Sequence, residues 1–188
     1  MPFNAAVERV RTALNETAAE VDVWFDRPEP LWTYRQSNGG WSIQQVLEHI
    51  TLTTRFLLLT CEKHERIAQH RATRGDRIPD GESDLERMAT IGERGSFRWI
   101  RPEHMEPTGA PPMVEVRATL SQQWRQCHEI LEALRGGKGA LCHVTMTVNQ
   151  LGKIDLYQWL YFVALHARRH VQQMRSVEAE FRARGNPG

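Results

Sequence analysis

The chain has 188 residues, enough for one domain with a substantial core and too few for two domains of ordinary size. Lys and Arg number 24 against 23 for Asp and Glu, which gives a formal net charge of +1 at pH 7. A balance this even excludes the strong overall field that attracts nucleic acids or anionic membranes. We therefore expect a single domain over residues 1–188, with neither nucleic acid nor membrane as a partner.

The N-terminus and the cysteine content indicate a cytoplasmic protein. Charged residues come too early for the apolar region of a signal peptide, and apolar runs such as Phe56 to Leu59 are too short to span a bilayer. The three cysteines are odd in number and form no CxxC, so neither a disulfide framework nor a zinc ribbon is indicated. We expect reduced, partly buried thiols at Cys61, Cys127 and Cys142.

Four segments carry helical periodicity, with apolar residues returning every three or four positions, and no segment of comparable length alternates with period two. This pattern predicts an all-α protein. The first helix should run from about Asn4 to Phe25, before Pro28 and Pro30 end it. Residues 27–40 are then expected to form a loop.

The second helix has the clearest start in the chain. Ser42 can act as its N-cap and Gln45 can complete a capping box, so the helix should begin at Ile43. It should continue to about Arg74, because Gly75 and further helix-breaking residues follow.

A long crossover should connect the second helix to the third. Residues 76–112 hold five of the nine prolines, and we expect one short helical turn within them, around residues 84–91. The third helix should run from about Met113 to Leu134, where two glycines end it. A glycine-rich loop is expected to follow.

The fourth helix should start as the second one does, since Asp155 can cap it and Gln158 lies three residues further on. Its apolar stripe advances in steps of three or four residues. Two histidines occupy positions where this pattern otherwise places core side chains. The stripe consists of Trp159, Val163, His166, His170, Met174, Val177 and Phe181.

His166 and His170 are candidate metal ligands, because residues four apart on a helix lie about 40° apart around its axis and face the same side. Eight histidines scattered at random would give about one third of such a pair, so the spacing alone is weak evidence. Two imidazoles buried side by side need partners for their ring nitrogens, and a shared metal ion supplies them. Carbonyl or carboxylate groups are the alternative partners.

His49 is the natural third ligand. It lies about two turns into the second helix and adjoins the apolar stripe there, so we expect it to face the bundle interior. A lone inward histidine is more often a satisfied core residue than a ligand. Helical bundles, however, build metal sites from side chains on facing helices.

Two longer motifs contain these histidines. They read Trp41-Ser42-Ile43-x-x-Val46-Leu47-x-His49 and Leu156-x-x-Trp159-Leu160-x-Phe162-x-x-x-His166-x-x-Arg169-His170-x-x-Gln173. In combination they resemble the DinB-like superfamily of metal-binding four-helix bundles, over most of the chain. The resemblance implies that the three metal ligands fall on His49, His166 and His170. It also implies an up-down-down-up bundle, frequent dimerisation, and a divalent ion such as zinc or nickel. Iron is also compatible with three imidazole ligands.

Members of that family include bacillithiol transferases and mycothiol-dependent maleylpyruvate isomerases. Three neutral imidazoles suit such ions, and no cysteine or carboxylate in the motifs clearly completes a closed tetrahedron, so one position should hold water or substrate. We expect either transfer of a low-molecular-weight thiol or hydrolysis of a small molecule. The alternatives are a non-catalytic metal-binding or ligand-sensing module and a dimeric scaffold with a metal-free histidine cluster.

The residues next to the histidines do not identify a general base. Glu48 points about 100° away from His49 around the helix, so we expect it to be solvated or salt-bridged. Arg169 and Gln173 flank the pair and can orient ligands or bind an anionic substrate, although an arginine there more often makes a structural ion pair. Arg169 also stands where a zincin HExxH motif has glutamate, which argues against that class of protease.

Overall fold

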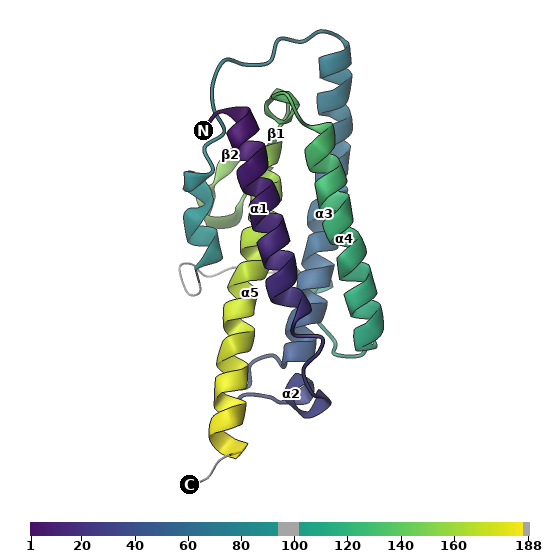
Figure 1. Ribbon diagram of the computed structural model, residues 1–188, viewed down its shortest axis with the longest axis vertical. Coiled ribbons are helices and arrows are strands. Elements are labelled where there is room, and N and C mark those ends of the chain that lie inside the picture. The colour runs from purple at the N-terminus through teal and green to yellow at the C-terminus, as the bar shows by residue number, and fades with distance from the viewer. Residues whose placement is uncertain (94–101, 186–188) are drawn as a thin grey trace.

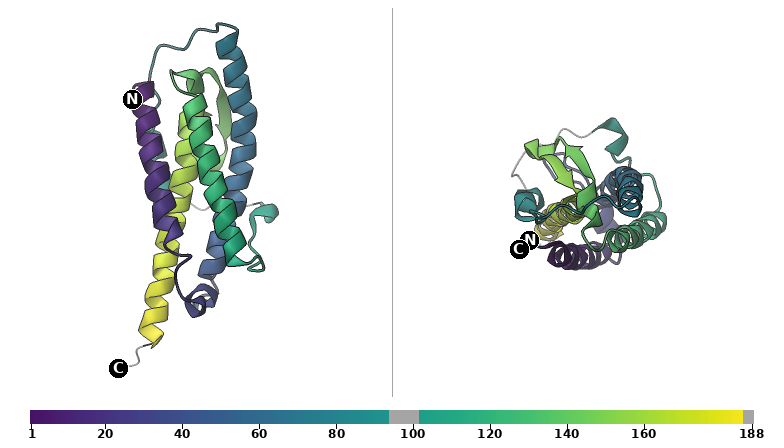
Figure 2. Two further views of the ribbon diagram at one scale, coloured as in Figure 1. Left: turned by 45° about the vertical axis from the view of Figure 1, so that its right-hand side comes forward. Right: turned by 90° about the horizontal axis from the view of Figure 1, so that it is seen from above.

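The computed structural model describes residues 1–93 and 102–185. The protein is mostly helical, as predicted, and its four long helices pack side by side (Figure 1). A short helix, α2, lies near one end of the bundle, and a two-stranded hairpin lies near the other (Figures 1 and 2). The long helices are α1 (Phe3–Asp22), α3 (Ile43–Thr73), α4 (Met113–Ala133) and α5 (Leu156–Gly185).

Contacts between helices define their directions. Arg117 near the start of α4 pairs with Asp22 at the end of α1 at 2.6 Å, so these two helices are antiparallel. Gln69 near the end of α3 donates to the carbonyl of Ala133 at the end of α4, so these two are parallel. α5 runs from the hairpin end towards the α2 end, opposite to α3 and alongside α1 (Figure 1).

Both helices that carry the candidate histidines begin with the predicted capping interactions. The Gln45 amide donates to Ser42 Oγ at 3.3 Å, and the Ser42 amide donates to Gln45 Oε1 at 3.2 Å. At α5 the Gln158 amide donates to Asp155 Oδ1 at 2.8 Å, and the Asp155 amide donates to Gln158 Oε1 at 2.9 Å. These bonds satisfy amides that lack partners in a helix and fix the residue at which each helix starts.

α5 is the most deeply covered helix of the bundle. Residues 156–167 are buried without interruption, and α1, α3, the hairpin and a 3-10 helix all pack against α5. A helix segment buried on every side has its rotation set by packing, so the two histidines that follow have a defined direction. Within the described residues, no helix is long and apolar enough to cross a membrane.

The predicted loop after α4 is partly a β-hairpin, so that prediction was incomplete. Strands β1 (His143–Met146) and β2 (Gly152–Asp155) pair antiparallel, with His143 opposite Asp155. In β1 exposed and buried side chains alternate over only four residues, too few to stand out beside long helical patterns. The connection between the strands uses the left-handed backbone region at Asn149 and Gln150.

The predicted loop over residues 27–40 contains the short helix α2 (Glu29–Thr33). The two prolines of this segment, Pro28 and Pro30, follow α1 and also lie at the start of α2. Proline is tolerated in the first helical turn because its missing N–H has no helical acceptor there. The same residues therefore separate one helix from the next.

The crossover contains the predicted helical turn, which is a 3-10 helix, η1 (Glu86–Gly92), packed on α5. A second 3-10 helix, η2 (Glu103–Met105), contacts α3. Residues 94–101, which belong to the predicted crossover, lie outside the described residues.

Gly139 is a position where the fold has no room for a side chain. Its amide donates to the buried Tyr157 hydroxyl at 3.1 Å, and that hydroxyl donates to the Leu134 carbonyl at 2.6 Å. An added Cβ would lie 2.7 Å from the tyrosine ring. We expect Gly139→Ala to lower the free energy of unfolding by about 1–3 kcal/mol, as measured by urea denaturation. Gly185→Ala is the matched control because its Cβ would meet no atom within 4 Å, and an equal loss there would contradict the prediction.

Candidate functional site

The structure brings the three predicted histidines together. His49 extends from α3, and His166 and His170 extend from α5. One donor nitrogen from each lies within 4.8 Å of the others, and the Nε2 atoms of His166 and His170 are 3.1 Å apart. The His49 ring centroid is 4.8 Å from that of His170 and 5.4 Å from that of His166. The cluster therefore spans the interface between two facing helices.

These separations suit ligands of one metal ion. Zinc–nitrogen distances of about 2.0–2.1 Å place two nitrogens of a tetrahedral site roughly 3.3 Å apart, close to the 3.1 Å between the two α5 imidazoles. Among residues 1–93 and 102–185, no cysteine, aspartate or glutamate joins the cluster. The described donor set is three imidazoles, which leaves a position for water or substrate on an ion bound there.

A backbone carbonyl of the crossover determines the tautomer of His49. Its Nδ1 is 2.8 Å from the carbonyl oxygen of Met105. A carbonyl oxygen only accepts hydrogen bonds, so Nδ1 carries the proton and Nε2 presents its lone pair. The Thr53 hydroxyl lies 3.4 Å from Nε2, and the Trp41 ring packs against the imidazole with centroids 4.7 Å apart. The ring is therefore held in one orientation by groups around it.

His170 is oriented in the same way from within α5. Its Nδ1 is 2.9 Å from the side-chain oxygen of Gln173, so Nε2 is the nitrogen that faces the cluster. Of the two roles predicted for Gln173, orienting ligands or binding an anionic substrate, this contact with His170 supports the first. His170 is half-buried whereas its two partners are buried, so the cluster approaches the protein surface at this residue.

His166 is kept neutral by its surroundings. It is 1% exposed, and burial is the main cause that holds its pKa well below the usual range of histidine. The neighbouring charges of His170, His49 and Arg169 act in the same direction. A metal ligand must be an unprotonated imidazole, so this environment prepares His166 for coordination at neutral pH.

Glu48 is not a solvated or salt-bridged residue, and that prediction was wrong. It is 6% exposed, and its carboxylate accepts hydrogen bonds from the Thr108 hydroxyl at 2.9 Å and the Gly109 amide at 2.6 Å. The crossover covers this face of α3, and the spacing of residues on the helix gives no sign of that cover. The carboxylate is therefore engaged in structure rather than directed at the histidines.

The three cysteines lie apart from the cluster and are buried. Burial raises the pKa of Cys61 well above its usual value and that of Cys127 to about 12. These thiols are therefore protonated at neutral pH. We expect Cys61 and Cys127 of the folded protein to react with a thiol reagent such as DTNB only as fast as the protein unfolds, and all three thiols to react at once in guanidinium. Rapid labelling of both residues in the native protein would contradict this.

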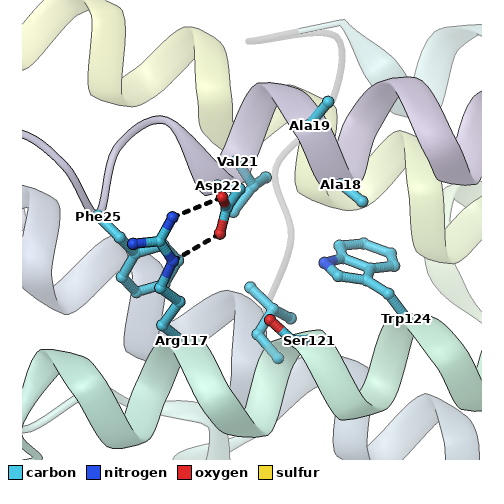
Figure 3. A pocket seen from close by; sticks show the side chains of 9 residues that line it. Ala18, Ala19, Val21, Asp22, Phe25, Arg117, Ser121 and Trp124 are labelled. Atoms are coloured by element: carbon cyan, nitrogen blue, oxygen red, sulfur yellow. Dashed lines mark hydrogen bonds and ion pairs between the residues drawn. The ribbon is translucent and has the colours of Figure 1, made fainter.

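A separate hollow of about 300 Å³ lies between α1 and α4 (Figure 3). Trp124 and Phe25 contribute to its walls, and Arg117 closes one edge through two hydrogen bonds to Asp22, at 2.6 and 2.8 Å. The helices that form this hollow carry none of the three histidines, so it is distinct from the histidine cluster.

Comparison with protein families found one match of note. A family model described as the DinB superfamily matches residues 6–174, which is most of the chain and includes all three histidines. Comparisons with curated proteins and with solved structures found no match.

Proposed function

Since this chain belongs to the DinB superfamily, we propose that His49, His166 and His170 bind one divalent transition-metal ion at an open site. The observation that carries this proposal is the convergence of three imidazole nitrogens from facing helices to within 4.8 Å. Imidazole ligands suit zinc or nickel best among the ions considered, and iron is also compatible. The helix directions described above support an up-down-down-up bundle for the whole domain.

The proposed reaction is transfer of a low-molecular-weight thiol to a second small molecule. A bound divalent ion supplies Lewis acidity that lowers the pKa of a thiol or a water at its open position. The protein's own buried cysteines are protonated, so the reacting thiol must come from a substrate. A carboxylate base would favour hydrolysis, but none joins the histidines in the described part of the chain, and Glu48 is bound to the crossover. Thiol transfer is therefore the better supported reaction.

In such a reaction the substrate thiol loses its proton to solvent and its sulfur forms a bond to an electrophilic carbon of the second molecule, while a leaving group departs from that carbon with the electron pair of the broken bond. The chain's residues prepare the site. His49 and His170 are oriented by Met105 and Gln173, and His166 is kept neutral by burial. Trp41 places an apolar ring beside His49, which limits water on that side.

The same proposal extends to partners. The near balance of charge supports a small-molecule substrate rather than a nucleic acid or a membrane. We propose a cytoplasmic homodimer, as the family resemblance implies. Sedimentation equilibrium of the metal-loaded protein tests the dimer, and a concentration-independent monomer mass would overturn it.

The function is tested by metal analysis followed by two assays. Untagged protein is analysed by mass spectrometry for bound metal, then assayed for consumption of low-molecular-weight thiols with an electrophile and for hydrolysis of a nitrophenyl ester. We expect about one equivalent of metal and thiol transfer that chelation abolishes. If the protein hydrolyses the ester but transfers no thiol, hydrolysis becomes the supported reaction in place of thiol transfer. Metal without either activity would favour a non-catalytic module, and no metal after reconstitution would overturn the proposal.

A further inference from the structure

The crossover docks on the first two turns of α3 through a buried carboxylate. Glu48 accepts hydrogen bonds from the Thr108 hydroxyl at 2.9 Å and from the Gly109 amide at 2.6 Å. One turn earlier, Gln44 donates to the Gly109 carbonyl at 2.7 Å. Gly109 is thus held through both its amide and its carbonyl. The docked segment therefore has a defined position on the helix surface.

Burial makes the Glu48 interaction strong. Glu48 is 6% exposed, so little water can reach its side chain and its hydrogen bonds to the protein are costly to break. Hydrogen bonds to an ionised acceptor are also roughly twice as strong as those between neutral groups. Release of Thr108 and Gly109 would leave this carboxylate without the two donors it has here. The docked crossover is accordingly stabilised at this point.

The same crossover segment reaches the histidine cluster. Met105 lies three residues before Thr108, is 3% exposed, and accepts the Nδ1 proton of His49 at 2.8 Å. His49 is the next residue after Glu48 on α3. One short stretch of the crossover is therefore fixed at one end by Glu48 and orients a cluster histidine at the other. Residues 105–109 are called the crossover clamp below.

We infer that Glu48 is a positioning residue for the metal site, acting through the crossover clamp. Its carboxylate holds Thr108 and Gly109, and these hold the Met105 carbonyl on His49 so that Nε2 faces the other two imidazoles. This inference rests on the proposed metal binding. Hydrogen bonds that orient a metal-bound histidine from behind contribute 10–100-fold to metal affinity, about the size of effect expected here. By linkage, a bound metal should stabilise the docked crossover clamp to the same extent.

Gly109 offers a second way to disturb the clamp without altering Glu48. Its φ is +74°, in the left-handed region that glycine adopts readily and other residues rarely do. A Cβ there would lie 3.3 Å from Cγ of Gln45. Gly109→Ala should therefore displace the clamp without substituting Glu48 or any of the three histidines.

The first test measures Zn²⁺ affinity by competition with a chromophoric chelator in Glu48→Gln and Gly109→Ala. Glutamine keeps the shape of Glu48 but presents only one acceptor oxygen to the two donors. We expect both variants to bind Zn²⁺ about 10–100-fold more weakly than the parent. Asp155→Asn is the matched control, because this carboxylate is 5% exposed and caps α5 away from the clamp. Asparagine can still accept the Gln158 amide, so this variant should keep the parent affinity.

The second test measures hydrogen exchange of peptides covering residues 105–109, with and without Zn²⁺. The parent should exchange more slowly there when Zn²⁺ is bound, and Glu48→Gln should lose most of this protection. If Glu48→Gln and Gly109→Ala bind Zn²⁺ as tightly as the parent, the positioning role of Glu48 is overturned. The proposed metal site is not affected by that result. An equal loss of Zn²⁺ affinity in Asp155→Asn would show that the loss is not specific to the crossover clamp. That result would also overturn the inference. Absence of Zn²⁺ binding by the parent would overturn both the clamp and the proposed function.

Discussion

Replacing His166 with alanine is expected to lower the bound metal from about one equivalent per chain to near zero. His166 is the most deeply buried member of the cluster, at 1% exposure, and its Nε2 lies 3.1 Å from that of His170. Loss of a direct ligand should cost more than the 10–100-fold that loss of a supporting hydrogen bond costs. The measurement is metal content by mass spectrometry after dialysis against a weak chelator.

His49→Ala and His170→Ala should give the same result, since each removes one of three donors. His64→Ala is the matched control. His64 lies on α3 like His49, but its Nδ1 is bonded to the Thr60 carbonyl at 2.7 Å and it is no part of the cluster. Circular dichroism establishes that each variant is folded. Full metal retention in the folded cluster variants, or loss in His64→Ala, would refute the ligand assignment.

Removing the metal is expected to lower the melting temperature of the parent by roughly 8–16 °C. A ligand that binds only the folded state stabilises it by about 4 kcal/mol when its free concentration is 1,000 times its dissociation constant. For a chain of this size each kcal/mol changes the melting temperature by roughly 2–4 °C. The unfolded chain lacks the assembled site because the ligands come from two separate helices.

Differential scanning calorimetry with saturating Zn²⁺ and with chelator measures this shift. His170→Ala should melt at the same temperature in both conditions, because the binding that produces the shift is lost. If the parent protein melts at the same temperature with chelator as with Zn²⁺, the prediction is contradicted. A shift of equal size in His170→Ala would place the bound metal elsewhere.

The features that could be predicted from sequence are those determined by neighbours in the chain. The caps at Ser42 and Asp155 depend on a partner three residues away, and both helices start where these pairs indicate. The contact between Gln173 and His170 is also local, since Gln173 lies one turn after His170. The all-α class followed from periodicity alone, because helices of twenty or more residues give many repeats of the pattern.

The features that could not be predicted depend on the path of the crossover. The burial of Glu48 arises from Thr108 and Gly109, and no spacing rule on α3 indicates them. The Met105 contact to His49 uses a backbone carbonyl, which every residue possesses, so the sequence carries no signal for it. Sequence reasoning could find the cluster histidines, but it could not find what holds them.

The position of the three histidines along the chain has a consequence for biosynthesis. His166 and His170 are local to one helix, whereas His49 is separated from them by well over half of the chain. α5 follows the other long helices in chain order, so a ribosome-bound chain that has not yet produced α5 contains only one of the three ligands. Bringing His49 together with His166 and His170 closes a long loop of chain, which costs conformational entropy. It depends on packing of α5 against α3. Metal acquisition should therefore be a late event, and its rate should report when the last helix docks.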